Sequence, residues 1–422
     1  MTHPKGVSAP GRSQLATWRR QHSAKAYFAG THRAAAPAET LERLRPLLPR
    51  MGITRVANVT GLDILGIPVV MVCRPNSRAL AVSQGKGLTL DAAKVSGIME
   101  SAESYHAERL SGPLLLTTHE EMAGSRSLVD VERLPIARGA RFHRRLPILW
   151  VEGFDLLCEE WAWLPYDSVH TDFTLDRQKD LSGFIPTSNG LASGNTLLEA
   201  LSHALLELVE RDAWVVWEML PDARKRSTRV DLASVRGGEA RALLDRLERS
   251  GVGVVLWETT GDIRLPSFRC LIADAAPDPF RPLYVTYGSG CHLSREVALC
   301  RAITEAVQSR LTLVSGARDD ILAADYERLL DPGIQQHVAA VLAEQGRRNF
   351  TEAPDLSTPS FDEDVAAELD ALQQAGIKSA VVVDLTLAEI AIPVVKCVVP
   401  GLEMPTKLGR PPGPRALASL RR

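Results

Sequence analysis

The chain contains three pairs of short β-branched segments, each preceded by a segment whose apolar residues recur at helical spacing. Runs of Val and Ile predict strands, whereas apolar residues repeated every three to four positions predict a helix. A glycine stands where each helix is expected to end. The predicted helices cover 39–50, 239–250 and 364–375, and the strand pairs cover 52–59 with 66–73, 251–256 with 264–270, and 376–383 with 391–397. The pattern predicts a mixed α/β fold with internally repeated units.

A second repeat consists of three apolar helices that carry acidic residues. Each follows a Gly/Ser-rich segment, expected to be a loop, at 83–87, 188–194 or 288–292. The aligned residues of the three copies are Ala93, Glu100 and Glu103, then Ala200, Glu207 and Glu210, then Ala298, Glu305 and Gln308. The repeated unit is therefore strand pair, Gly-rich loop and acidic helix. The middle helix departs from this order, because it follows the strand-like segment 149–164.

Helical spacing places the polar residues of each copy on one stripe. Positions i, i+4 and i+7 lie on the same face of a helix. The three stripes are Ser96 with Glu100 and Glu103, His203 with Glu207 and Glu210, and Arg301 with Glu305 and Gln308. Asn195 and Glu199 fall nearby, one or two turns before the middle stripe. The other faces are apolar, so the carboxylates are costly to bury unless positive charge meets them.

These stripes predict a site for Mg²⁺ ions that carry phosphates. Mg²⁺ prefers oxygen ligands from carboxylates, water and phosphate. The candidate metal ligands are Glu100, Glu103, Glu199, Glu207, Glu210 and Glu305. Lys86, Arg211 and Arg301 are candidates to neutralise phosphate charge, with backbone N–H groups of the loops at the helix N-termini. The segment 83–87 is not a Walker A motif. A purely structural set of salt-bridged glutamates in a duplicated scaffold is the alternative.

His292 lies just before the third acidic helix, a position that suits contact with phosphate or action as a base. The alternative is a loop histidine whose hydrogen bonds are satisfied within the protein. Gln308 stands where the other copies have Glu103 and Glu210, and its neutral amide is a candidate to face the nucleotide or substrate rather than metal. No residue is singled out as the catalytic acid or base.

Bulk properties exclude several other classes of protein. The 422 residues are 45% hydrophobic and 24% charged, which is typical of a soluble globular protein. A net charge of −2 gives no reason to expect nucleic-acid binding. Six scattered cysteines without a CxxC pair argue against a zinc cluster and favour a reduced, cytoplasmic setting. No apolar run is long enough to span a membrane, and no secretory signal is evident. We expect a mostly loose tail at 1–34, one catalytic unit at 35–400 and a C-terminal tail at 401–422.

The acidic motifs resemble the nucleotide-binding motifs of YcaO-domain proteins, and the resemblance extends from about residue 25 to the C-terminus. The matching motifs are Ser96 to Glu103, Asn195 with Glu199, Glu207 with Glu210 and Arg211, and Arg301 with Glu305 and Gln308. The resemblance implies an ATP- and Mg²⁺-dependent enzyme that phosphorylates the oxygen of a peptide backbone amide before a nucleophile displaces the phosphate. It implies that the six glutamates hold Mg²⁺ and the phosphates. It also implies that Ser96, Asn195, Arg211 and Arg301 contact the nucleotide.

The product depends on the nucleophile. An internal Cys, Ser or Thr gives an azoline, and an external sulfide gives a thioamide. The Pro-x-Pro-x-Pro end of many azoline-forming members is absent here, since the chain has Arg-Pro-Pro-Gly-Pro-Arg at 410–415. The segments 55–63, 66–70 and 83–87 look most like members that work with a TfuA partner. The resemblance therefore favours thioamidation with a TfuA-like partner, a peptide or protein substrate and a homodimer. A cyclodehydratase, a non-catalytic peptide-binding subunit and an unrelated metal hydrolase are the alternatives.

Overall fold

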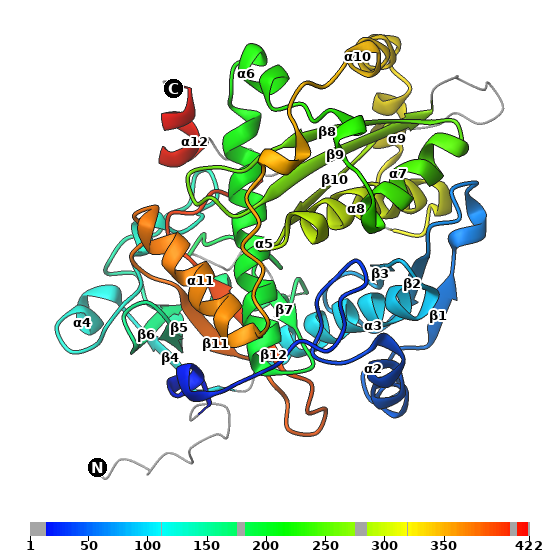
Figure 1. Ribbon diagram of the computed structural model, residues 1–422. Helices are drawn as coiled ribbons and strands as arrows, with labels where there is room; N and C mark the ends of the chain where they lie inside the picture. The colour runs from blue at the N-terminus through cyan, green and yellow to red at the C-terminus, as the bar shows by residue number, and fades with distance from the viewer. Residues whose placement is uncertain are drawn as a thin grey trace.

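The computed structural model describes residues 14–110, 112–174, 182–274, 285–318, 320–405 and 412–420. These residues form three antiparallel sheets with helices packed around them (Figure 1). The first sheet contains β1 (Arg55–Asn58), β2 (Val69–Cys73) and β3 (Val82–Lys86). The second contains β8 (Val252–Glu258), β9 (Ser267–Asp274) and β10 (Thr286–Cys291). The third contains β4 (Leu114–Thr117), β5 (Ile148–Asp155), β6 (Glu160–Pro165), β7 (Leu191–Ser193), β11 (Val381–Asp384) and β12 (Val394–Val398).

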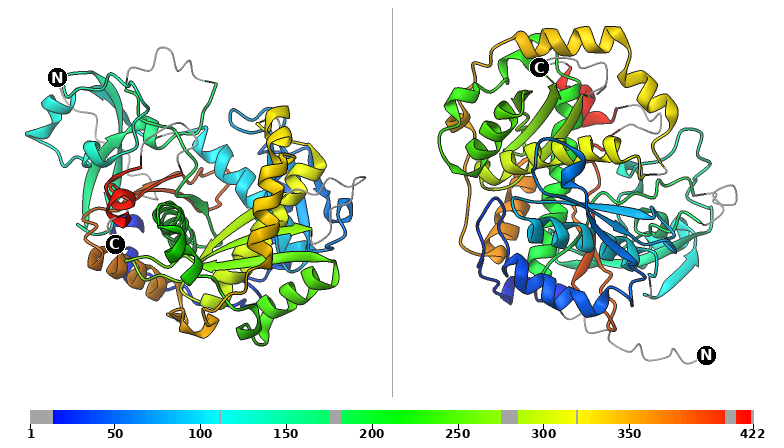
Figure 2. Two further views of the ribbon diagram at one scale, coloured as in Figure 1. Left: turned by 90° about the horizontal axis from the view of Figure 1, so that it is seen from above. Right: turned by 90° about the vertical axis from the view of Figure 1, so that its right-hand side faces the viewer.

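The helices that carry the acidic stripes are α3 (Leu90–Ala107), α5 (Leu197–Glu218) and α8 (Arg295–Ser315). The remaining α-helices are α2 (Pro37–Leu44), α4 (His119–Ala123), α6 (Asp222–Ser227), α7 (Gly238–Arg249), α9 (Ala323–Leu329), α10 (Pro332–Ala343), α11 (Phe361–Gln374) and α12 (Pro414–Ser419). Figures 1 and 2 show α5 crossing the middle of the molecule. It contacts β10, α11 and β12. None of the helices in the described ranges is long and apolar enough to cross a membrane.

The mixed α/β fold predicted from the sequence is confirmed. The three predicted strand pairs form the antiparallel pairs β1–β2, β8–β9 and β11–β12. The strand-like segment before the middle acidic helix is the hairpin of β5 and β6. The predicted helices correspond to α2 with a following 3-10 turn, α7 and α11. The β-branched runs located the strands, and the apolar repeat located α7 and α11, each of which buries one face in the core.

The Gly/Ser-rich segments before the acidic helices are strands rather than the loops that were expected. They form β3, β7 and β10, and each is an edge strand of its sheet. The glycines let these strands lie directly against a helix backbone. A Cβ atom on Gly85 would stand 2.0 Å from the carbonyl oxygen of Ala93 in α3, and one on Gly288 would stand 2.2 Å from that of Ala302 in α8. Glycine is required here for close approach between strand and helix.

The segment 1–34 was expected to be a mostly loose tail; its residues 14–34 pack on the folded body, and the rest of it lies outside the described residues. Trp18 is 2% exposed and packs in the core beside α5 and α11. The ammonium group of Lys25 is fully buried and lies 2.7 Å from the carboxylate of Asp364. At the other end, α12 packs on α5, and Arg415 forms an ion pair with Asp212 at 2.9 Å. Both ends of the described chain therefore belong to the folded body.

Candidate active site

The three acidic helices begin in the same way. Each follows its edge strand after a short turn, and a hydroxyl side chain caps its N-terminus. Thr89, Thr196 and Ser294 accept hydrogen bonds from the backbone N–H three residues later. The carboxylate stripe of each helix consequently starts next to the free edge of a strand.

Those free edges donate hydrogen bonds to the carboxylates. Along an edge strand, alternate N–H groups point away from the sheet and need a partner. In β7 the backbone N–H of Ser193 donates to Glu103 at 2.9 Å, and its hydroxyl donates to the same oxygen at 2.7 Å. In β10 the N–H of Cys291 donates to Glu210 at 3.1 Å, and that of Ser289 donates to Glu305 at 3.4 Å. The strands therefore hold carboxylates from all three helices.

Two cations connect Glu305 of α8 to other elements of the site. The Lys86 ammonium on β3 lies 2.8 Å from the Glu305 carboxylate on α8. The Arg211 guanidinium on α5 lies 3.8 Å from Glu305 and 3.6 Å from Glu210. These contacts bring β3, α5 and α8 together, although the residues are far apart in sequence. The predicted convergence of Lys86, Arg211, Glu210 and Glu305 is present in the structure.

The pKa values of the acidic residues differ, and with them the ease with which each carboxyl group ionises. Burial raises the pKa of Glu103 to about 8, and the charges of Glu100 and Glu207 add to this effect. Burial likewise raises the pKa of Glu207 to about 7, with Arg211 opposing it. For Glu305 burial acts in the same direction, but Lys86 and Arg211 outweigh it and hold the pKa at about 2. Without an added cation, Glu103 and Glu207 therefore resist ionisation, whereas Glu305 stays charged beside Lys86 and Arg211.

This donor set fits Mg²⁺, although the side chains are not yet arranged around an ion. Carboxylate oxygens are the ligands that Mg²⁺ prefers. Glu207 makes no hydrogen bond or ion pair with any described residue, so its oxygens are available. In the described part of the chain, no three acidic, histidine or cysteine side chains converge into a complete metal site. One physical reason is that Lys86 and Arg211 occupy the oxygens of Glu305.

Asn195 and Glu199 form a separate network at the N-terminus of α5. The Asn195 amide donates to Glu199 at 3.1 Å, while its carbonyl oxygen accepts from Thr40 and Arg43, each at 2.8 Å. Glu199 also accepts from the backbone N–H of Ala34 at 3.2 Å. The structure therefore joins the two predicted residues to each other rather than to Glu207. The role of Glu199 as a metal ligand stays a prediction.

Arg301 and His203 lie together between α8 and α5. Their nearest nitrogens are 3.3 Å apart. Nε of Arg301 is buried and has no hydrogen-bond partner among the residues that the structure describes. Burial and the charge of Arg301 hold the pKa of His203 well below its usual range, so this imidazole is neutral. Unsatisfied donors on a buried cation are suited to the oxygens of a bound anion.

The other predicted nucleotide contacts occupy less informative positions. The Ser96 hydroxyl accepts from the backbone N–H of Lys86 at 3.4 Å. His292 accepts from the N–H of Ser294 at 2.9 Å through Nδ1, and burial holds its pKa well below the usual range. It is thus a neutral, satisfied histidine in this structure. Gln308 is half-buried on α8, and its side chain makes no hydrogen bond with the described residues.

Sequence reasoning missed Lys396, which lies near the site. Its side chain is 1% exposed and donates to the backbone oxygens of Asn189, at 2.6 Å, and Thr187. Burial lowers the pKa of Lys396 to about 8, and the charge of Glu207 opposes that change. The available signal was a lone lysine within the β-branched run of β12. A buried strand seldom contains a lysine without a specific partner.

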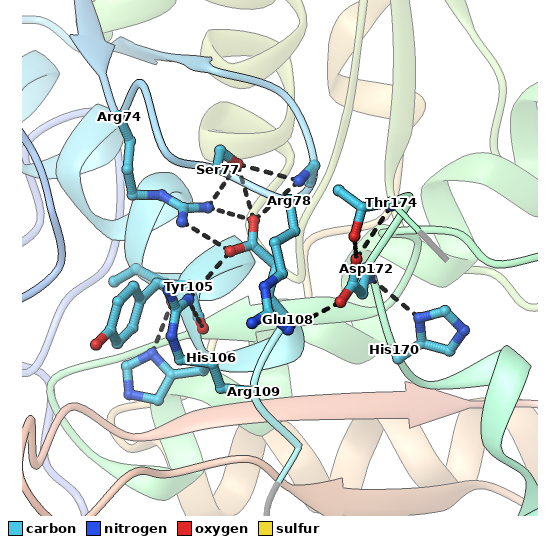
Figure 3. Close-up of polar contacts among 12 residues, drawn as sticks. Arg74, Ser77, Arg78, Tyr105, His106, Glu108, Arg109, His170, Asp172 and Thr174 are labelled. Carbon is cyan, nitrogen blue, oxygen red and sulfur yellow. Dashed lines mark hydrogen bonds and ion pairs between the residues drawn. The ribbon is translucent and has the colours of Figure 1, made fainter. Parts of the chain in front are cut away.

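The C-terminal end of α3 is fixed by a buried ion pair (Figure 3). Two nitrogens of Arg74 lie 2.7 and 2.5 Å from the two carboxylate oxygens of Glu108, which also accepts from the Ser77 hydroxyl at 2.8 Å. Close by, Arg78 donates to Asp172 at 2.9 Å. These contacts tie α3 to the segments after β2 and β6. They hold the helix that presents Glu100 and Glu103.

The raised pKa values predict opposite pH dependences for stability and for metal binding. Glu103 and Glu207 titrate near pH 8 and 7 in the folded chain, and at lower pH when unfolded. Their contribution to the stability of the metal-free protein is therefore present at low pH and lost as the pH rises through 7 and 8. Mg²⁺ needs the deprotonated carboxylates, so its affinity should rise over the same range. Thermal unfolding and Mg²⁺ titration between pH 6 and 9 measure both trends; parallel trends would contradict this assignment.

Comparison with known proteins identifies the family. The YcaO family, described as YcaO cyclodehydratase, ATP- and Mg²⁺-binding, matches residues 84–403, the stretch that contains all three acidic helices. The chain belongs to the YcaO family. Its predicted cofactors, ATP and Mg²⁺, are those of the family description.

Two uncharacterized bacterial relatives and two solved structures extend the comparison. The chain is 36% identical over 376 residues to a protein in the tfuA 3′ region of Rhizobium leguminosarum bv. trifolii, covering 88% of this chain and 89% of that protein. It is 33% identical to a protein of Mycobacterium tuberculosis, covering 88% of this chain and 83% of the relative.

Among solved structures, a heterocyclase in complex with substrate and cofactor superposes with a TM-score of 0.75 at 24% identity, over 91% of this YcaO chain. The YcaO chain spans 54% of that heterocyclase. The YcaO of Methanopyrus kandleri, bound with AMPPCP and Mg²⁺, superposes with a TM-score of 0.68 at 24% identity, over 90% of this chain and 95% of that one. These likenesses show that the fold is shared.

Proposed function

We propose that the protein uses Mg·ATP to phosphorylate the oxygen of a peptide backbone amide, and that the product is a thioamide. The observation that carries the proposal is the meeting of β3, α5 and α8 at Glu305, through Lys86 and Arg211. Glu100 on α3 lies within electrostatic range of Lys86 and Glu305. A carboxylate cluster interspersed with cations suits a triphosphate and its metal ions. An amide oxygen is a poor leaving group, and phosphorylation makes it a good one.

Each residue of the site has a distinct task in this proposal. Glu100, Glu103, Glu207, Glu210 and Glu305 would hold Mg²⁺, and Glu199 remains a further candidate. When bound, Mg²⁺ neutralises phosphate charge and orients the phosphates. The cations Lys86, Arg211 and Arg301 balance the rest of the phosphate charge, while Ser96, Asn195, His292 and Gln308 are retained as candidate nucleotide contacts.

Binding of the phosphates requires Lys86 to exchange its contact with Glu305 for one with the ligand. This exchange frees the oxygens of Glu305 and offers the ammonium group to a phosphate in the same movement. Glu207 needs no such exchange, since its carboxylate has no partner among the described residues. The carboxylate of Glu207 is therefore available to metal at once, whereas that of Glu305 becomes available when nucleotide binds.

Thioamidation is favoured over azoline formation by the relative from the tfuA 3′ region. A TfuA-like protein is accordingly the proposed partner, and a peptide or protein the proposed substrate. Azoline formation is the second candidate, because the family description names a cyclodehydratase. The proposed homodimer and cytoplasmic location rest on the sequence alone.

Mass spectrometry of a peptide substrate separates the two products. The test combines the protein, a TfuA-like protein, Mg·ATP, a sulfide source and peptides encoded near the gene. Thioamidation exchanges oxygen for sulfur and raises the peptide mass, whereas cyclodehydration removes water and lowers it. We expect an ATP-dependent gain. An ATP-dependent loss of water would replace the thioamide proposal by the azoline one, and an unchanged mass with every peptide would contradict both.

A further inference from the structure

Arg269 is a buried arginine without a carboxylate partner. It is 9% exposed, yet it forms no ion pair with any residue in the described ranges. Arg74, at 2% exposure, shows the usual arrangement, since Glu108 binds it through two hydrogen bonds. The hydrogen bond of Arg269 is a long one, 3.4 Å from Nη1 to the hydroxyl of Ser289. A buried unpaired charge costs stability and calls for an explanation.

Two aromatic rings hold the guanidinium in place. Its central carbon lies 4.4 Å from the ring centroid of Trp214 on α5 and 4.8 Å from that of Tyr287 on β10. Such contacts stabilise the cation through the ring faces and leave its N–H groups free to donate. Tyr287 is 39% exposed, so this cluster reaches the molecular surface. The cluster therefore presents a fixed cation with available donors.

The cluster adjoins the acidic site. Arg269 on β9 is paired in register with Ser289 on β10, whose backbone N–H donates to Glu305. Trp214 follows Arg211 by about one turn of α5. Burial lowers the pKa of Arg269, the charges of Glu218 and Glu305 oppose that change, and the charge of Arg211 adds to it. The free guanidinium thus lies within electrostatic range of the proposed site of phosphoryl transfer.

We propose that Arg269, held by Trp214 and Tyr287, forms an oxyanion subsite beside the Mg·ATP site. The chemistry it selects is a planar or tetrahedral oxyanion, because the guanidinium fork donates paired hydrogen bonds to carboxylate and phosphate. The oxyanion has two possible sources, a carboxylate of the peptide substrate and a phosphate of the nucleotide. The identity of the two oxyanions rests on the proposed function. The position of the subsite rests on the unpaired Arg269.

The stability of Arg269→Gln distinguishes two roles for Arg269, one in binding an oxyanion and one in supporting the fold. Removing an unpaired buried charge should leave the melting temperature unchanged or raise it. A structural arginine would give the opposite result, a marked fall or a failure to fold. Tyr287→Ala, which removes the exposed ring but keeps the charge, provides a second variant. Arg145→Gln is the matched control, since it removes a positive charge at an exposed position.

Two binding arms identify the source of the oxyanion. In the first, the acetylated tetraglycine carboxylate and its amide are titrated by saturation-transfer NMR, with and without Mg·AMPPCP. In the second, Mg·ATP is titrated calorimetrically. We expect the wild-type protein to bind the carboxylate more tightly than the amide. Arg269→Gln should lower the affinity for either the peptide carboxylate or Mg·ATP about tenfold or more. Weaker carboxylate binding identifies the peptide, and weaker Mg·ATP binding identifies the nucleotide.

Three results would contradict the proposed subsite. They are unchanged affinities for both ligands in Arg269→Gln, an equal loss of affinity in the Arg145→Gln control, and a large loss of stability in Arg269→Gln. Failure of the proposed function is a different outcome. Wild-type protein would then not bind Mg·ATP, while the carboxylate arm without nucleotide would still report on Arg269.

Discussion

Replacing Glu207 by glutamine is expected to weaken Mg·ATP binding and to lower peptide-dependent ATP turnover by about a hundredfold or more. Loss of a residue that merely supports a metal ligand costs about 10- to 100-fold, so loss of a ligand itself should cost at least as much. Glu207 is the strongest choice because its carboxylate has no other partner among the described residues. Glutamine keeps its size and removes its charge, which isolates the effect on the metal. Steady-state phosphate release and calorimetric titration measure the two effects.

Glu368→Gln is the matched control for this substitution. Glu368 is fully buried on α11, and it accepts a hydrogen bond from Ser202 of α5 at 2.7 Å. Burial holds its pKa well above the usual range, so the group is neutral and resembles glutamine. The control should therefore keep its Mg·ATP affinity and turnover. Normal turnover in Glu207→Gln, or equal losses in both variants, would remove Glu207 from the metal site.

Replacing Arg74 by glutamine is expected to lower the free energy of unfolding by about 3–5 kcal/mol. Removing one partner of a buried ion pair leaves the other charge uncompensated, and that is the typical cost. Glu108 is 4% exposed and would lose its two hydrogen bonds from Arg74. Because these contacts hold the end of α3, the loss should also loosen the helix that presents Glu100. Equilibrium unfolding in urea measures the change.

An exposed ion pair supplies the control for Arg74. Arg145 lies 3.0 Å from Glu120, but the two side chains are 80% and 50% exposed. Exposed pairs contribute about 0–1 kcal/mol, so Arg145→Gln should change stability by no more than that. A loss below about 1 kcal/mol in Arg74→Gln would contradict a structural role for the buried pair.

The sequence predicted the elements whose pattern is local. The β-branched runs of β11 and β12 and the apolar repeat of α11 each identify an element without knowledge of its neighbours. The edge strands were missed because glycine has a low strand propensity, and its role at Gly85 appears only when α3 lies against it. Residues 14–34 were missed because Lys25 is stabilised by Asp364, which is distant in sequence.

The candidate site shows the same division between local and distant information. Helical spacing correctly placed Glu207 and Glu210 on one stripe, because that relation depends on a single helix. The ion pair between Lys86 and Glu305 follows from packing of β3 against α8, which no pattern within either segment specifies. Arg269 was missed for a related reason. The sequence of an apolar strand does not indicate whether a carboxylate lies beside its arginine in the folded protein.

The most direct test of the account is calorimetric titration of ATP into the wild-type protein, with and without Mg²⁺. The convergence of three carboxylate-bearing helices around Lys86 and Arg211 predicts binding that requires Mg²⁺ and disappears when EDTA is added. Absence of binding in the presence of Mg²⁺, or binding of equal strength with EDTA, would contradict the assignment of these helices to a Mg·ATP site.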